Sequence, residues 1–214
     1  MIRVYKSKEA PLSLSSCKKY DSEDIKSQLA NDQKGKCYIC ERKRDTDFEI
    51  DHLKSQSNNP DLVYCWDNIF LICGYCNKKK SNMFDNILVP NVDSIEEIIA
   101  QTISFENKKA IFASTSNSEK CNQTIKLLNS IFNGANQGLR TLKEERMFKS
   151  LVSCINQFNG LIKAFFDNPN ANFQNNIREE LNIESEFLGF KYQIIKNNPI
   201  LLKVFAPDIV WNNA

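Results

Sequence analysis

Residues 66–80 read WDNIFLICGYCNKKK, an apolar run that leads into the Cys-x-x-Cys pair Cys73 and Cys76. A matching pair, Cys37 and Cys40 in CYIC, precedes it, with 32 residues between the two pairs. Two such pairs supply four soft thiolates, which is the ligand set of a closed, tetrahedral structural zinc site. The spacing therefore predicts one zinc ion bound by all four cysteines. The alternatives are ordinary buried cysteines or a redox-active pair.

Eight cysteines against a single histidine, His52, are the unusual part of the composition. A cytosolic chain of 214 residues does not need disulfides to fold and would not keep them, so the cysteines require another explanation. The four cysteines outside the two pairs are interpreted as small apolar packing residues. They are Cys17, Cys65, Cys121 and Cys154.

Length and composition indicate an ordinary soluble protein of one or two domains, with 42% hydrophobic and 25% charged residues. No apolar run approaches the roughly 18 residues that a membrane helix needs, and the N-terminus lacks the apolar segment of a signal peptide. We therefore expect a cytoplasmic protein with no membrane segment. Residues 1–90 hold 15 Lys and Arg against 13 Asp and Glu, and the remainder holds 13 of each. With so little net charge, affinity for nucleic acid should be modest without a partner.

The first 90 residues predict a small zinc-stabilised module. Polar and apolar residues alternate in TDFEIDH at 46–52, which favours a strand, and NIFLI at 68–72 predicts a second strand. A helix is expected at 21–34, before the first cysteine pair, and another at 76–84. The predicted order is therefore a first zinc knuckle around Cys37 and Cys40, a strand, a loop, a second strand, a second knuckle around Cys73 and Cys76, and a helix.

Near residues 88–93 the sequence changes from cysteine pairs and short strands to stretches with mainly helical spacing. This change predicts two domains, 1–90 and 91–214. The second domain is expected to be mainly helical, with a β-hairpin in ISFENKKAIFAS at 103–114. The fold class expected for the whole chain is α+β.

Several helices are predicted after residue 90. Ser94 and Glu97 have the spacing of a capping box before IEEIIA, and a long amphipathic helix is expected over about 136–166. Two shorter helices, about 172–182 and 186–197, precede an apolar tail. The apolar stripe of the long helix consists of Leu139, Leu142, Phe148, Leu151, Ile155, Phe158, Ile162 and Phe165.

Residues 35–82 resemble HNH endonucleases of the ββα-metal type. In that family a knuckle is followed by a strand ending in Asp-His, a central Asn and a closing C-x-x-C-[N/H]-x-x-K, and EIDHL and CGYCNKKK occur here in the same order. The resemblance places Asp51 and His52 on the Asp-His pair, Asn68 on the central Asn and Asn77 on the final His/Asn position. Asn77 then offers an amide oxygen where many members have an imidazole.

The chemistry of phosphodiester hydrolysis fits these residue types. A neutral His52 can accept a proton from the attacking water as general base. Asp51 and Asn77 offer hard oxygen ligands suited to Mg²⁺ or Mn²⁺. Asn68 is expected to hold the loop that presents the histidine. The alternatives are a packed or surface histidine at His52 and a simple helix cap at Asn77.

Three consecutive lysines follow Asn77 in the sequence. They are either phosphate contacts or one solvated face of a helix, and the sequence does not favour either interpretation. These residues are Lys78, Lys79 and Lys80.

A broader resemblance is carried by IRVYKSKEAPLSL, QKGKCYICE, EIDHLKSQS and WDNIFLIC. These stretches are similar to the HNH proteins of Septu-type phage-defence systems, usually called PtuB and also found as retron effectors. Members act with an ABC-like ATPase, which implies that residues 91–214 dock this partner, and a retron reverse transcriptase with its nucleic acid is a further implied partner. The resemblance is good over residues 1–90 and loose beyond.

Two other functions remain open on the sequence. One is a zinc-knuckle module that binds nucleic acid without cleaving it, and the other is a stand-alone restriction-type HNH DNase. The intact Asp51-His52 pair and Asn77 argue against the first, and the absence of a basic appendage argues against the second. The sequence does not decide between DNA and RNA as substrate.

Overall fold

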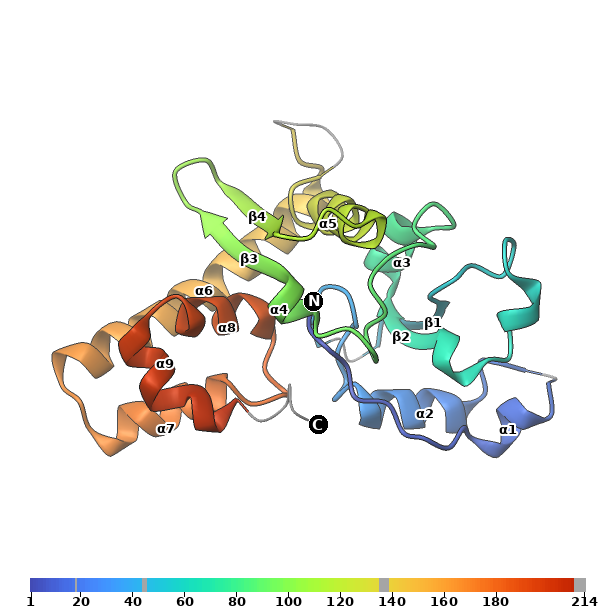
Figure 1. Ribbon diagram of the computed structural model, residues 1–214, viewed down its shortest axis with the longest axis horizontal. Coiled ribbons are helices and arrows are strands. Elements are labelled where there is room, and N and C mark those ends of the chain that lie inside the picture. The colour runs from blue at the N-terminus through green and yellow to red at the C-terminus, as the bar shows by residue number, and fades with distance from the viewer. Residues whose placement is uncertain (18, 44–45, 135–138, 210–214) are drawn as a thin grey trace.

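The computed structural model describes residues 1–17, 19–43, 46–134 and 139–209 and has a mixed α+β fold. Two antiparallel sheets of two strands each lie apart from one another, and α5 (Glu119–Phe132) lies between them, in contact with both α3 and β4 (Figure 1). The predicted α+β class is confirmed. The described elements of the N-terminal part are α1 (Leu12–Ser15), α2 (Glu23–Asp32), β1 (Phe48–His52), η1 (Pro60–Leu62), η2 (Trp66–Asn68), β2 (Ile69–Cys73) and α3 (Gly74–Lys80).

The first sheet pairs β1 with β2, and α3 begins directly after β2. Its register places Phe48 opposite Cys73 and His52 opposite Ile69. Successive side chains of a strand point to opposite faces. Ile69 and Leu71 therefore pack with α2, while the alternate residues of β2 pack on the other side, toward the cysteine pairs. The sheet thus separates two environments, and α3 lies on the side of the cysteines.

In the described residues, the part after residue 90 consists of a β-hairpin, six α-helices including α5, and one short 3₁₀-helix. The hairpin packs between α5 and α8, and α7 packs along α6 (Figure 1). Its elements are α4 (Ile95–Ile98), β3 (Ile99–Ser104), β4 (Lys109–Ser114), α6 (Leu142–Asp167), α7 (Ala171–Glu180), α8 (Leu188–Lys196), α9 (Pro199–Phe205) and η3 (Ala206–Asp208).

The largest hydrophobic core crosses residue 90. It joins the paired cysteines and β2 to β4, α5, α6 and α8, with Phe112, Phe132 and Phe190 in mutual ring contact. Polar contacts also join the parts before and after residue 90. The buried carboxylate of Glu41 in the first knuckle accepts hydrogen bonds from the Met1 amino group and from the backbone N–H of Gly189. The division into domains 1–90 and 91–214 stays a prediction, and the two parts share their main core.

Most predicted elements are confirmed with shifted ends. Both strands of the first module, the helices around them, the hairpin and the long helix are present. Six of the eight residues assigned to the long stripe are buried, whereas Leu139 and Leu142 are 81% and 68% exposed, so this part of the prediction is wrong. The helix begins at Leu142, after the N-cap Thr141, and the predicted start near 136 lies outside the described residues.

The capping box predicted at Ser94 is also wrong. The Ser94 side chain makes no cap hydrogen bond, and α4 ends after four residues because Ile99 begins β3. The Glu97 carboxylate instead accepts hydrogen bonds from Tyr192 and Lys196 of α8. Strand pairing and these tertiary contacts outweigh the local capping preference.

Among the described residues, no helix has the length and apolar character that crossing a membrane requires.

Candidate functional site

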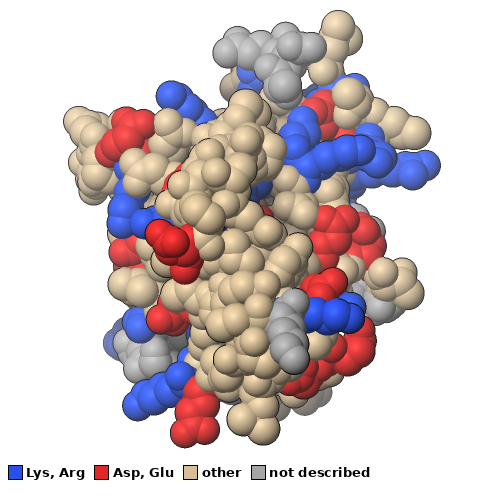
Figure 2. Space-filling model, turned by 90° about the vertical axis from the view of Figure 1, so that its right-hand side faces the viewer, with Lys and Arg blue, Asp and Glu red and all other residues tan. Residues whose placement is uncertain are grey.

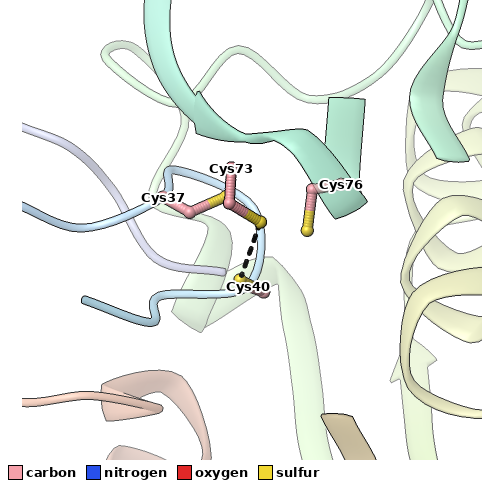
Figure 3. Close-up of side chains that lie close together, drawn as sticks. All are labelled: Cys37, Cys40, Cys73 and Cys76. Carbon is pink, nitrogen blue, oxygen red and sulfur yellow. Dashed lines mark hydrogen bonds between the residues drawn. The ribbon is translucent and has the colours of Figure 1, made fainter. Parts of the chain in front are cut away.

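Four cysteine side chains meet where the first knuckle faces the end of β2. Cys37 and Cys40 lie in the loop after α2, where the N–H of Cys37 donates to the carbonyl of Arg42. Cys73 ends β2 and Cys76 lies in the first turn of α3. The four Sγ atoms lie within 4.8 Å of one another, and those of Cys40 and Cys73 are 3.9 Å apart (Figure 3). The predicted grouping of these cysteines is confirmed.

The geometry and chemistry of the four cysteines fit a structural zinc ion. A tetrahedral ion with Zn–S bonds of about 2.3 Å places its sulfur atoms about 3.8 Å apart, close to the arrangement seen here. All four side chains are buried, and burial raises the pKa of the Cys76 thiol. Four thiolates in this interior would need a cation to balance their charge, and a zinc ion bound by all four cysteines would supply it.

Asp51 lies on the same side of the first sheet as the cysteines and is buried. Its carboxylate accepts a hydrogen bond of 2.6 Å from the hydroxyl of Tyr38, and the ammonium of Lys80 lies 3.2 Å away. Lys80 also donates to the backbone carbonyl of His52 at 2.8 Å, and its side chain is 1% exposed. Burial raises the pKa of Asp51, and the Lys80 charge opposes this shift. Lys80 thus ties α3 to the end of β1.

Replacing Lys80 with methionine, which keeps the apolar stem but removes the ammonium, should destabilise the protein strongly. The Asp51 carboxylate would remain buried without its counter-charge, and breaking a buried pair in this way costs about 3–5 kcal/mol. The measurement is the free energy of unfolding from urea titration of the zinc-loaded protein. Lys78→Met, at an exposed position of the same helix, is the matched control and should change stability by about 0.5 kcal/mol or less. Equal losses in both variants would contradict the assigned role of Lys80.

His52 points to the opposite face of β1 and is enclosed by three groups. Its ring packs edge-on against Tyr20 at a centroid distance of 4.7 Å, and Nε2 lies 2.8 Å from the carbonyl oxygen of Val63. Because this carbonyl can only accept, Nε2 carries the hydrogen and Nδ1 is the basic atom. Nδ1 is 3.0 Å from the amide nitrogen of Gln56. Burial lowers the pKa of His52, which favours the neutral ring that a general base requires.

Asn68 holds both ends of the loop that follows His52. Its Oδ1 accepts from the N–H of Lys54 at 2.8 Å, and its Nδ2 donates to the carbonyls of Lys54 and Leu62 at 3.0 and 3.1 Å. Leu62 precedes Val63, the residue that orients the imidazole. Asn68 therefore acts on His52 through the loop and does not reach it directly.

Asn77 lies in the middle of α3, and its amide nitrogen donates to the carboxylate of Glu49 at 2.5 Å. The N-cap of α3 is Cys73, so the alternative that Asn77 merely caps the helix is wrong. A Cβ atom at Gly74 would come within 2.8 Å of Glu49 Oε1 and 3.0 Å of Asp47 Oδ1, so the glycine permits the close approach of α3 to β1. Asn77, Glu49 and Asp47 border an open cavity of about 670 Å³.

The candidate residues fall into two groups on the two faces of β1. Asp51 and Asn77 both belong to the side of α3, but each has its own partner: Lys80 for Asp51 and Glu49 for Asn77. His52 belongs to the side of α2. Glu49 was not predicted as a site residue, although its position two residues before Asp51 places it on the same strand face.

The oxygen atoms of Asp51 and Asn77 are of the type that Mg²⁺ and Mn²⁺ prefer. At Asp51, however, the Lys80 ammonium already balances the carboxylate. An ion bound by Asp51 therefore requires Lys80 to release this contact.

The three lysines of α3 occupy different environments. Lys80 is buried against Asp51, so it fits neither of the two interpretations of the lysines, a phosphate contact or a solvated helix face. Lys79 forms an ion pair with the buried Glu144 of α6. Lys78 is exposed at the rim of the cavity beside Asn77 and is the one of the three that is free to meet a phosphate.

Comparison with protein families identifies the module that these residues form. Residues 37–83 match the family model of HNH endonucleases, and this range contains all four paired cysteines as well as β1, β2 and α3. The chain therefore carries an HNH endonuclease domain. That domain indicates a metal-dependent nuclease with nucleic acid as its substrate. A search of the curated proteins found no match.

Proposed function

We propose that the protein is an HNH endonuclease that hydrolyses phosphodiester bonds of DNA or RNA by attack of water. The observation that carries the proposal is the match over residues 37–83, within which Asp51 and His52 end β1 with their environments fixed by Lys80 and Val63. In this proposal the zinc site is a scaffold, because four cysteine ligands leave no open position for substrate.

Each residue has a distinct proposed role. His52 receives a proton from water at Nδ1, while the hydrogen bond of Nε2 to Val63 holds the ring and fixes its tautomer. Gln56, which now faces Nδ1, must move aside. Asp51 and Asn77 would hold Mg²⁺ or Mn²⁺, and the bound ion would stabilise negative charge on the phosphate. Asn68 positions His52 through the loop.

The direct test is incubation of the zinc-loaded protein with single-stranded and duplex DNA and RNA, with and without Mg²⁺ or Mn²⁺. Cleavage that requires the added ion supports the proposal. Binding without cleavage under all conditions would replace it with the zinc-knuckle binding module. Efficient, sequence-specific cleavage of duplex DNA by the protein alone would favour a stand-alone restriction-type enzyme.

We further propose that the nuclease acts with an ABC-type ATPase in anti-phage defence, with a retron reverse transcriptase and its nucleic acid as a possible additional component. The resemblance of residues 1–90 to Septu-type HNH proteins supports this. The formal net charge of only +2 supports it as well, because so small a charge gives weak nonspecific attraction for phosphate, so a partner would strengthen the hold on substrate. Figure 2 shows a face with an uncharged centre, where basic side chains gather at the upper right and acidic side chains lie below them.

The ATPase is proposed to dock on the helical region after residue 90, and single surface changes can test this. Ile200 on α9 is 59% exposed and Met83 beside α3 is 72% exposed. Ile200→Glu should reduce capture of a co-expressed ABC-type ATPase by the tagged full-length protein, because it places a charge in an apolar contact. Met83→Glu is the matched control in the HNH domain and should leave capture unchanged. Loss of capture with Met83→Glu alone would place the docking surface on the HNH domain.

A further inference from the structure

The cavity beside Asn77 is built from both parts of the chain. The HNH domain contributes Asp47, Glu49 and Asn77 on one side, and α6 contributes residues from its first two turns. Four basic side chains border this cavity, and we call them the basic wall. They are Arg42, Lys78, Lys143 and Arg146.

We propose that the basic wall binds the phosphate backbone of nucleic acid, so that α6 is part of the substrate-binding site. This inference rests on the proposed nuclease function and adds residues that lie outside the HNH domain. Lys143 and Arg146 are three positions apart on α6, so they share one face of the helix. Both side chains border the same cavity as Glu49 and Asn77.

The cations of the basic wall are not neutralised by ion pairs within the described part of the protein. Throughout residues 1–17, 19–43, 46–134 and 139–209, no carboxylate forms an ion pair with Arg42, Lys78, Lys143 or Arg146. The Nε of Arg42 is buried and has no hydrogen-bond acceptor. A buried donor without an acceptor is costly, so contacts among the described residues leave the Arg42 side chain unsatisfied. Four unpaired cations around one cavity thus favour a ligand with several negative charges.

The position of α6 relative to Asn77 is fixed by contacts on either side of the basic wall. Glu144, between the two α6 cations, is buried and pairs with Lys79 of α3, and it also completes a capping box with Thr141. Met147 is buried in the main core. Tyr75 of α3 donates to the carbonyl of Ile131 at the end of α5. Lys143 and Arg146 therefore project from a helix start that is held against the HNH domain.

The arrangement of charges favours a phosphate chain over a single small anion. Asp47 and Glu49 repel phosphate from the wall of the cavity formed by β1, so an anionic chain would run along the α6 side. Its phosphates would then pass Lys143 and Arg146 and reach Lys78, next to Asn77. A backbone with regularly spaced charges can meet all of these cations, and its binding should weaken steeply with salt.

The test compares two double variants of the full-length protein. Lys143→Ala with Arg146→Ala removes the α6 half of the basic wall. The matched control is Lys163→Ala with Lys203→Ala, which removes two exposed lysines, neither of which borders a described cavity or forms an ion pair. Binding to labelled DNA and RNA oligonucleotides is measured by fluorescence anisotropy between 50 and 200 mM salt, without Mg²⁺ or Mn²⁺. Circular dichroism and zinc content verify the fold of each variant.

The basic-wall variant should bind at least about tenfold more weakly at 50 mM salt, and its salt slope should fall by about 1.8 for duplex DNA or about 1.4 for single strands, because two phosphate contacts are lost. The control should bind like the wild type. Equal binding by both variants, or no binding of nucleic acid by the wild type, would overturn the inference. A further outcome separates the two proposals: the wild type binds nucleic acid, the basic-wall variant does not bind it, and neither protein cleaves it. The nuclease proposal then fails, and the inference that the basic wall binds phosphate stands.

Discussion

Replacing Cys73 with serine should abolish zinc binding and prevent the native fold from forming. Structural zinc contributes about 10–16 kcal/mol in zinc-finger peptides, whereas the whole stability of a typical domain is about 5–15 kcal/mol. The loss should spread beyond the HNH domain, because the cysteines lie in the same core as β4, α5, α6 and α8. The measurements are zinc per chain by elemental analysis and the thermal unfolding transition followed by circular dichroism.

The control for this prediction is Cys154→Ala. Cys154 lies on α6 and is half-buried, away from the cysteine cluster, so the variant should keep one zinc ion per chain and a cooperative unfolding transition. A Cys73→Ser protein that contained no zinc and unfolded at the wild-type temperature would refute a structural role for the metal. Serine is only slightly smaller than cysteine and lacks the thiolate, so the comparison reports on metal binding more than on packing.

The sequence is sufficient to predict that the four paired cysteines cluster and to predict the order of elements around them. Cys-x-x-Cys spacing is a local property, and the alternation in FEIDH is visible without any tertiary contact. The helix α5 was missed, although Leu127, Leu128 and Ile131 are spaced as on one helical face and all are buried. The apolar spacing that marks this helix is therefore visible in the sequence.

The partners of the polar site residues could not be predicted, because they depend on how elements pack. Glu49 and Asp51 are two residues apart on β1, and Asn77 and Lys80 are three apart on α3. The helix packs on the strand in a register that pairs Glu49 with Asn77 and Asp51 with Lys80. The sequence pattern C-N-K-K-K shows the lysines as equivalent, whereas packing buries Lys80, pairs Lys79 with Glu144 and exposes Lys78.

The shared core changes how the region after residue 90 is understood. A chain cut at residue 90 would expose the faces of the HNH domain that pack on α5 and α8, so its binding properties would not describe the intact protein. The same contact places α6 beside Asn77, through the pair of Lys79 and Glu144. Partner docking and substrate binding are therefore compatible roles for the helical region, since Ile200 lies on α9 while Lys143 and Arg146 border the cavity.

The second large effect is expected for His52→Ala, which should reduce Mg²⁺- or Mn²⁺-dependent cleavage by about 10²–10⁴-fold, the contribution of a general base. Zinc content and binding to nucleic acid should persist, because His52 belongs neither to the cysteine cluster nor to the basic wall. Its ring does pack on Tyr20, so some stability should be lost. The measurement is the single-turnover cleavage rate with enzyme in excess, at a temperature well below the unfolding transition of the variant.

Tyr20→Ala separates the loss of packing from the loss of the base. It removes the same ring contact from the other partner and leaves the imidazole with its hydrogen bond to Val63. If His52 acts chemically, Tyr20→Ala should retain most of the activity, and added imidazole should partly restore cleavage by His52→Ala by occupying the space of the missing ring. A role in packing alone predicts equal losses in the two variants and no response to imidazole. Wild-type cleavage by a folded His52→Ala protein would show that the nuclease centre lies elsewhere.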